Sequence, residues 1–129
     1  MLHVLIVDDD AAIRGLLATI LGTPECSVDL VSNGQEAIRA FADGEYDLVI
    51  TDLDMPRVDG KELTQSIRQH NTSVPVVMLT GCADPEAMTV DLKKVGVSKV
   101  ISKPFQIAEI LALKSLLAEK PAVREASAS

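Results

Sequence analysis

The 129-residue chain has few aromatic residues, few cysteines and no excess of basic residues. Its aromatic side chains are Phe41, Tyr46 and Phe105, which leaves no platform for stacking nucleic-acid bases. Lys and Arg number 12 against 19 Asp and Glu, and the net charge of -7 argues against direct nucleic-acid binding. Cys26 and Cys82 lack the spacing of metal ligands and are too few for a disulfide framework. We interpret them as reduced thiols.

Long hydrophobic runs are also missing. No apolar stretch approaches the roughly 18 residues that suggest a membrane span, and Met1, Leu2 and His3 lack the basic start of a secretory signal. We therefore expect a cytoplasmic protein without membrane insertion. Hydrophobic residues make up 47% of the chain, which is enough to build one core without cross-links.

Four short apolar runs are the clearest structural signal, and polar or charged residues follow each of them. Near-continuous apolar runs are typical of strands that are buried on both faces of a parallel sheet. A further alternating segment, residues 27–32, predicts an edge strand. The four apolar runs are residues 4–7, 48–51, 76–79 and 97–101.

The segments between these runs have helical patterns, which predict five β-α repeats. The expected fold is α/β and flavodoxin-like, (βα)5, a doubly wound five-stranded parallel sheet with strand order 2-1-3-4-5. Residues 1–118 would form this domain, and residues 119–129 a flexible tail or the start of a linker. Four helices are expected before the last strand: one capped by Asp10 that stops at Gly22, one ending near Gly44, one between Asp59 and His70, and one from Pro85 to Val95 that is stopped at Gly96. A last helix is expected with an apolar stripe of Ile107, Ile110, Leu111 and Leu117.

Acidic residues follow two strands that neighbour each other in the predicted order. Asp8 and Asp9 come after the first strand and Asp52 after the third, so their carboxylates can share one cavity at the carboxyl ends of the strands. Like charges this close repel unless a cation neutralises them, and all-oxygen ligands suit Mg2+ or Mn2+. A divalent metal is expected here.

Two further side chains can reach the same cavity. Lys103 follows the fifth strand and brings an ammonium, and Thr80 follows the fourth apolar run and brings a hydroxyl. Metal, ammonium and hydroxyl together can stabilise the oxygens of a phosphoryl group while a carboxylate attacks phosphorus. Asp52 is the expected nucleophile.

Residues 3 to about 118 resemble a two-component response-regulator receiver domain of the CheY-like superfamily. Each of the motifs that carry this resemblance is weak alone, but together they stand in the right order, each at a strand end. They are Val7-Asp8-Asp9, Asp52-Leu53-Asp54-Met55-Pro56 with Gly60, Thr80-Gly81, and Lys103-Pro104-Phe105.

The resemblance implies that Asp52 accepts a phosphoryl group from a phosphohistidine on a sensor histidine kinase or a histidine phosphotransfer protein. Asp9 and Asp52 would ligate Mg2+ directly together with the backbone carbonyl of Asp54, and Asp8 would contribute through water. Thr80 and Lys103 would sense the phosphoryl group and signal to a downstream output protein or domain.

The resemblance further implies a phosphoacceptor that assists only its own phosphorylation and dephosphorylation, so we do not expect an enzyme that acts on a separate substrate. It also implies a cis peptide bond between Lys103 and Pro104.

One position departs from the family pattern. Receivers commonly have Tyr or Phe three residues before the lysine, and here that residue is Val100. Because valine has no ring that could swing inward as Thr80 moves, any signal would travel through loop and helix shifts. His3 and His70 lack a partner acid or serine nearby in the pattern and are expected to be structural or exposed.

Two alternative functions stay open. Asp52-Leu53-Asp54 also resembles the Asp-x-Asp pair of haloacid-dehalogenase-type enzymes, which would make the protein a Mg2+-dependent phosphatase. Those enzymes place the pair on their first strand, whereas here it follows the third. The other alternative is a pseudo-receiver that docks partners without phosphorylation, and Val100 is the feature that favours it.

Overall fold

The computed structural model describes residues 1–81 and 85–115. A parallel sheet of five strands lies at its centre, in the order β2-β1-β3-β4-β5, which confirms the predicted flavodoxin-like fold. The strands are β1 (Leu2–Val7), β2 (Cys26–Val31), β3 (Leu48–Asp52), β4 (Val76–Thr80) and β5 (Lys99–Ser102). The helices are α1 (Ala11–Leu21), α2 (Gly34–Asp43), α3 (Gly60–Arg68), α4 (Pro85–Lys94) and a C-terminal helix that is described over residues 107–115.

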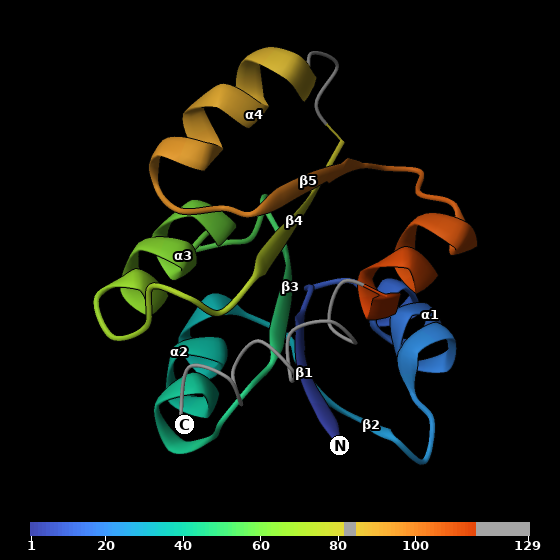
Figure 1. Cartoon of the computed structure of the whole chain (residues 1–129). Coiled ribbons are helices and arrows are strands. Elements are labelled where there is room, and N and C mark those ends of the chain that lie inside the picture. The colour runs from blue at the N-terminus through green and yellow to red at the C-terminus, as the bar shows by residue number, and fades with distance from the viewer. Residues whose placement is uncertain (82–84, 116–129) are drawn as a thin grey trace.

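Helices cover both faces of the sheet (Figure 1). Because side chains alternate along a strand, Val4 and Ile6 of β1 pack under α1 and the C-terminal helix, whereas Leu5 and Val7 pack under α2 and α3. A third apolar cluster lies beneath α4. The middle strands β3 and β4 are buried along their whole length, as their continuous apolar runs predicted.

Polar side chains fix where the helices begin. Asp10, Asn33 and Asp59 each accept a hydrogen bond from a backbone N–H in the first turn of α1, α2 and α3, respectively. The predicted Asp10 cap is therefore confirmed. Gly96 follows α4 with a φ of 104°, in the left-handed region that favours glycine, which agrees with the predicted stop at this residue.

The predicted apolar stripe of the last helix was wrong in part. Ile110 and Leu113 are its buried side chains, whereas Ile107 is 57% exposed and Leu111 is 45% exposed. Successive helical residues are about 100° apart, so Leu111 points away from the face that Ile110 and Leu113 share. Leu117, the domain boundary at residue 118 and the tail at 119–129 lie outside the described residues.

Over the parts of the chain that the structure describes, no helix combines the length and the apolar character needed to cross a membrane.

Candidate functional site

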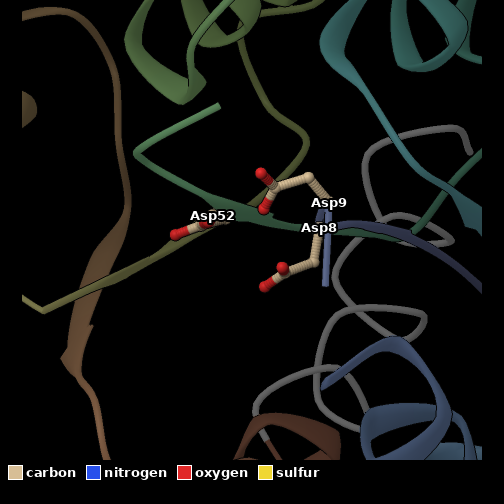
Figure 2. A group of neighbouring side chains, drawn as sticks. All are labelled: Asp8, Asp9 and Asp52. Carbon is tan, nitrogen blue, oxygen red and sulfur yellow. The ribbon is translucent and has the colours of Figure 1, made fainter. Parts of the chain in front are cut away.

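Three carboxylates meet where two paired strands end. Asp8 and Asp9 directly follow β1, and Asp52 is the last residue of β3, which pairs with β1. Figure 2 shows the three side chains gathered at these adjoining strand ends. One oxygen from each lies within 4.8 Å of the others, which is close enough to hold one metal ion. Asp8 and Asp52 are buried and Asp9 is exposed, so the group opens to solvent on one side.

Lys103 brings the counter-charge from the end of β5. Its Nζ lies 3.2 Å from Oδ1 of Asp52 and 3.3 Å from Oδ2 of Asp8. The backbone N–H of Lys103 donates to the carbonyl oxygen of Thr80 over 2.7 Å, which ties this loop to the end of β4. The Lys103–Pro104 peptide bond is cis, as the resemblance implied.

The charges at this site are not balanced, because three carboxylates face one ammonium. Burial and the nearby carboxylate of Asp8 raise the pKa of Asp52 despite the opposing effect of Lys103. Burial acts to lower the pKa of Lys103, but attraction to Asp52 and Asp8 outweighs it, and the pKa is raised. Lys103 is therefore a cation that neutralises only part of the negative charge. A divalent cation bound by oxygen ligands fits the remainder.

The loop after β1 is held by two hydrogen bonds. Oδ1 of Asp8 accepts from the backbone N–H of Asp10 over 2.9 Å, and Nη1 of Arg14 donates to the carbonyl oxygen of Asp8 over 2.6 Å. Both bonds restrict where the Asp8 carboxylate can point. Arg14 could not be recognised from the sequence, because nothing in the pattern distinguishes it from an ordinary surface arginine on α1.

Gly60 lets the start of α3 approach the end of β3. Its N–H donates to the carbonyl oxygen of Leu53 over 2.9 Å. A Cβ at this position would overlap the carbonyl oxygen of Asp52 and lie 2.6 Å from Sδ of Met78. The glycine of the Asp52–Gly60 motif therefore sets the backbone position of Asp52 itself. The side chain of Asp54, in the loop between, is exposed.

Thr80 is the last residue of β4 and is 1% exposed. Because β4 lies between β3 and β5, Thr80 stands between the strand that carries Asp52 and the strand that leads to Lys103. Its hydroxyl donates to Sδ of Met88 on α4 over 3.4 Å. The structure thus places Thr80 beside the carboxylate group, with its hydroxyl turned to α4.

The sequence profile of the response regulator receiver domain matches residues 4–114 of the chain. The chain belongs to this family. It is a receiver domain of two-component systems, which is a signalling domain. Neither the phosphatase nor the pseudo-receiver alternative is favoured by this match or by the relatives described next.

Curated relatives of the receiver are regulatory proteins. The chain is 39% identical to the transcriptional regulatory protein ResD of Bacillus subtilis, covering 88% of this chain and 47% of ResD. It is 33% identical to the regulatory protein AtoC of Escherichia coli, covering 84% of this chain and 23% of AtoC. The chain therefore spans about half or less of the length of these relatives.

Solved structures of similar receivers align over nearly their whole length. The chemotaxis response regulator CheY4 of Vibrio cholerae has a TM-score of 0.82 at 28% identity, covering 91% of this chain and 98% of CheY4. The response regulator TrrA of Thermotoga maritima, solved in complex with Mg(2+)-BeF, has a TM-score of 0.79 at 32% identity, covering 91% of this chain and 99% of TrrA.

A second polar cluster of the receiver lies near the amino end of the sheet. Nε2 of His3 lies 2.9 Å from Oδ2 of Asp29, and the hydroxyl of Tyr46 donates to the same oxygen over 2.7 Å. Nδ1 of His3 lies 2.9 Å from the carbonyl oxygen of Glu45. His3 is therefore structural, as expected, although its partner acid could not be found nearby in the sequence: parallel pairing of β1 with β2 supplies it from 26 residues away. His70 is exposed, as expected.

The pKa shifts in this second cluster show an ionised Asp29 carboxylate that is stabilised by its neighbours. The hydrogen bond from Tyr46, aided by His3, lowers the pKa of Asp29. Burial, together with the hydrogen bond to Asp29, raises the pKa of Tyr46 to about 12. These groups satisfy one another, so this cluster is better suited to hold β1, β2 and the start of β3 together than to bind a cation.

Proposed function

We propose that Asp52 of this receiver accepts a phosphoryl group from a phosphohistidine on a sensor histidine kinase or a histidine phosphotransfer protein, in a reaction that requires Mg2+. The observation that carries the proposal is the buried Asp52 carboxylate beside two other carboxylates and the Lys103 ammonium. An oxygen of Asp52 bonds to phosphorus as the phosphorus–nitrogen bond of the donor breaks. The imidazole leaves with the electron pair and takes up a proton.

The three carboxylates fit a hard cation, since all of their ligand atoms are oxygens. Asp9 and Asp52 would hold Mg2+ directly with the backbone carbonyl of Asp54, and Asp8 would act through water; Mn2+ fits the same ligands. When bound, the ion neutralises negative charge on the carboxylates and on the incoming phosphoryl oxygens.

Lys103 and Thr80 would hold the phosphoryl oxygens that the metal does not reach. Nζ of Lys103 already lies 3.2 Å from Oδ1 of Asp52, the side chain on which the group would form. A compact ammonium at this distance stabilises the oxygens of the transferring group as charge develops on them. The hydroxyl of Thr80 would turn toward the same group and report its presence.

The wider setting is part of the proposal. Residues 1–118 act as a cytoplasmic receiver, and residues 119–129 are a tail or the start of a linker. The receiver assists only its own phosphorylation and dephosphorylation and signals to an output protein or output domain. The similarity to ResD and AtoC, which are both longer regulatory proteins, supports an output of this kind. The net charge of -7 disfavours direct contact with nucleic acid.

Intact mass spectrometry after incubation with Mg2+ and acetyl phosphate tests the proposal. We expect one labile phosphoryl adduct on the wild type, none on Asp52→Asn, and none when the metal is chelated. Asp91→Asn, an exposed acid on α4, is the matched control and keeps the adduct. An adduct that persists on Asp52→Asn, or that forms without metal, contradicts the proposal. Continuous turnover of a small phosphomonoester would favour the phosphatase instead.

A further inference from the structure

The hydroxyl of Thr80 is held by a side chain that the proposed phosphorylation chemistry does not use. It donates to Sδ of Met88 over 3.4 Å, across from β4 to α4. The backbone of Thr80 is tied to the neighbouring strand end, because its carbonyl oxygen accepts from the N–H of Lys103. Rotation about χ1 is therefore the simplest way for the hydroxyl of Thr80 to leave the sulfur.

Met88 also belongs to the apolar cluster beneath α4. This cluster has Met78, Leu92 and Val97 at its buried centre. Met88, Leu53 and Val100 are partly buried against it, and Leu53 directly follows Asp52. The sulfur of Met88 thus contacts the hydroxyl of Thr80, and the Met88 side chain packs in the apolar cluster beneath α4. A movement of the Thr80 hydroxyl would therefore change the packing of α4.

We propose that Met88 is a positioning residue for Thr80: its thioether holds the hydroxyl in the unphosphorylated receiver, and a phosphoryl group on Asp52 draws the hydroxyl away and frees Met88 and α4 to shift. The proposal rests on phosphorylation of Asp52. Val100, in the same cluster, has no polar atom and no long side chain with which to follow Thr80, whereas the unbranched Met88 side chain can readjust.

The relative strength of the two acceptors decides which of them binds the Thr80 hydroxyl in each state of the receiver. A thioether sulfur is a weak hydrogen-bond acceptor. A hydrogen bond to an ionised oxygen is roughly twice as strong as one between neutral groups, so a phosphoryl oxygen outcompetes the sulfur for the hydroxyl. Once the phosphoryl group is lost, the buried hydroxyl again has Met88 as a partner, and α4 returns.

Methyl NMR of the intact chain, labelled with 13C at the methionine methyl groups, tests the proposal. The chain has four methionines, so each methyl resonance can be assigned by substitution. Mg2+ with beryllofluoride serves as the phosphoryl mimic, and the 19F signal of the bound mimic reports occupancy independently. We expect the Met88 methyl resonance to move when the mimic binds. In Thr80→Val, which removes the hydroxyl but keeps the shape, we expect it to start at a different position and stay there.

Affinity for the mimic gives a second readout. Met88→Leu removes the thioether acceptor while keeping an apolar side chain, so we expect it to tighten beryllofluoride binding about twofold to threefold. Met78→Leu makes the same chemical change at another methionine of the same cluster and serves as the matched control. A purely structural role for Met88 would loosen binding or change it as much as Met78→Leu does.

The outcomes separate this proposal from the proposed function. A bound mimic with an unmoved Met88 resonance would overturn the role of Met88 and leave phosphorylation of Asp52 standing. Equal Met88 resonances in the free wild type and free Thr80→Val would overturn it as well, without any mimic. Absence of a bound 19F signal together with absence of the acetyl phosphate adduct would overturn both.

Discussion

At the carboxyl end of the sheet, three carboxylates lie together and the ammonium of Lys103 contacts two of them, Asp8 and Asp52. Near the amino end, one carboxylate, Asp29, contacts both Tyr46 and His3. The pKa of an aspartate side chain shifts in opposite directions at these two places. The pKa of Asp52 is raised, chiefly by burial, and the pKa of Asp29 is lowered, chiefly by its hydrogen bond from Tyr46.

These opposite pKa shifts distinguish a cluster suited to binding a cation from a cluster that stabilises the fold. A carboxylate with a raised pKa destabilises the fold once it is ionised, and a bound cation removes that cost. A carboxylate with a lowered pKa already has its partners and adds to the stability of the fold. The carboxyl end therefore holds unsatisfied negative charge that favours Mg2+, and the amino end holds a satisfied network that stabilises the sheet.

Removing the counter-charge of the carboxyl end should have the largest effect on stability. Lys103→Met leaves the buried carboxylates of Asp8 and Asp52 without their cation. Breaking a buried ion pair typically costs 3–5 kcal/mol; because the Lys103 side chain keeps 26% of its exposure, we expect about 2 kcal/mol at neutral pH. Urea unfolding measures it, with Lys99→Met, an exposed lysine of β5, as control. Equal stability of the two variants would mean that Lys103 does not neutralise the buried carboxylates.

Closing the space at Gly60 should have an effect on stability of similar size. In Gly60→Ala, the added Cβ would overlap the carbonyl oxygen of Asp52 and crowd Sδ of Met78, and overpacking of this kind costs about 1–3 kcal/mol. Gly15→Ala is the opposite control, because Gly15 lies inside α1 with nothing within 4 Å of the new Cβ. We expect that variant to gain about 0.5–1 kcal/mol from helix propensity. Thermal unfolding of both variants measures the contrast, which disappears if α3 simply shifts to make room.

Breaking the satisfied cluster should have a smaller effect with a defined pH dependence. Asp29→Asn removes the carboxylate from its two partners, and we expect a loss of about 1 kcal/mol at neutral pH, since Asp29 is about half exposed. The folded pKa of Asp29 is lowered, so its contribution is present above its unfolded pKa and is lost as pH falls through the lowered folded value. The difference in unfolding free energy from wild type should therefore shrink on acidification. A difference that grows in acid would contradict the network.

Titration of the single tyrosine gives the most local measurement. The ultraviolet absorbance of tyrosinate should rise with a midpoint of about 12 in the wild type, because burial and Asp29 raise the pKa of Tyr46. Asp29→Asn should move the midpoint back toward the ordinary value of about 10 while leaving the burial contribution. A midpoint that does not respond to Asp29→Asn would show that the Tyr46–Asp29 hydrogen bond is absent in solution.

The sequence was informative where one residue type implies one local structure. Continuous apolar runs located the strands, Asp10 marked the start of α1, and Gly96 marked the end of α4. The placement of Asp8, Asp9 and Asp52 followed because parallel strands bring their carboxyl ends to one edge. These predictions need only periodicity and topology.

The sequence was uninformative where a contact depends on packing between distant segments. The partners of His3 come from β2 and from the loop before β3, and only the register of the sheet shows that they meet. The contact between Thr80 and Met88 depends on where α4 lies over the sheet. The exposed Leu111 illustrates the same limit, because hydrophobicity alone does not show which face of a helix meets the core.

The most direct test of the contrast between the two ends is thermal unfolding of wild type and Asp52→Asn with and without Mg2+. Without metal, Asp52→Asn should raise Tm, because the raised pKa of Asp52 means that its ionised form is disfavoured in the fold. Mg2+ at 100 times its Kd should stabilise the wild type by about 2.7 kcal/mol and stabilise Asp52→Asn far less. A lower Tm for Asp52→Asn without metal, or equal stabilisation of both proteins by Mg2+, would contradict the account.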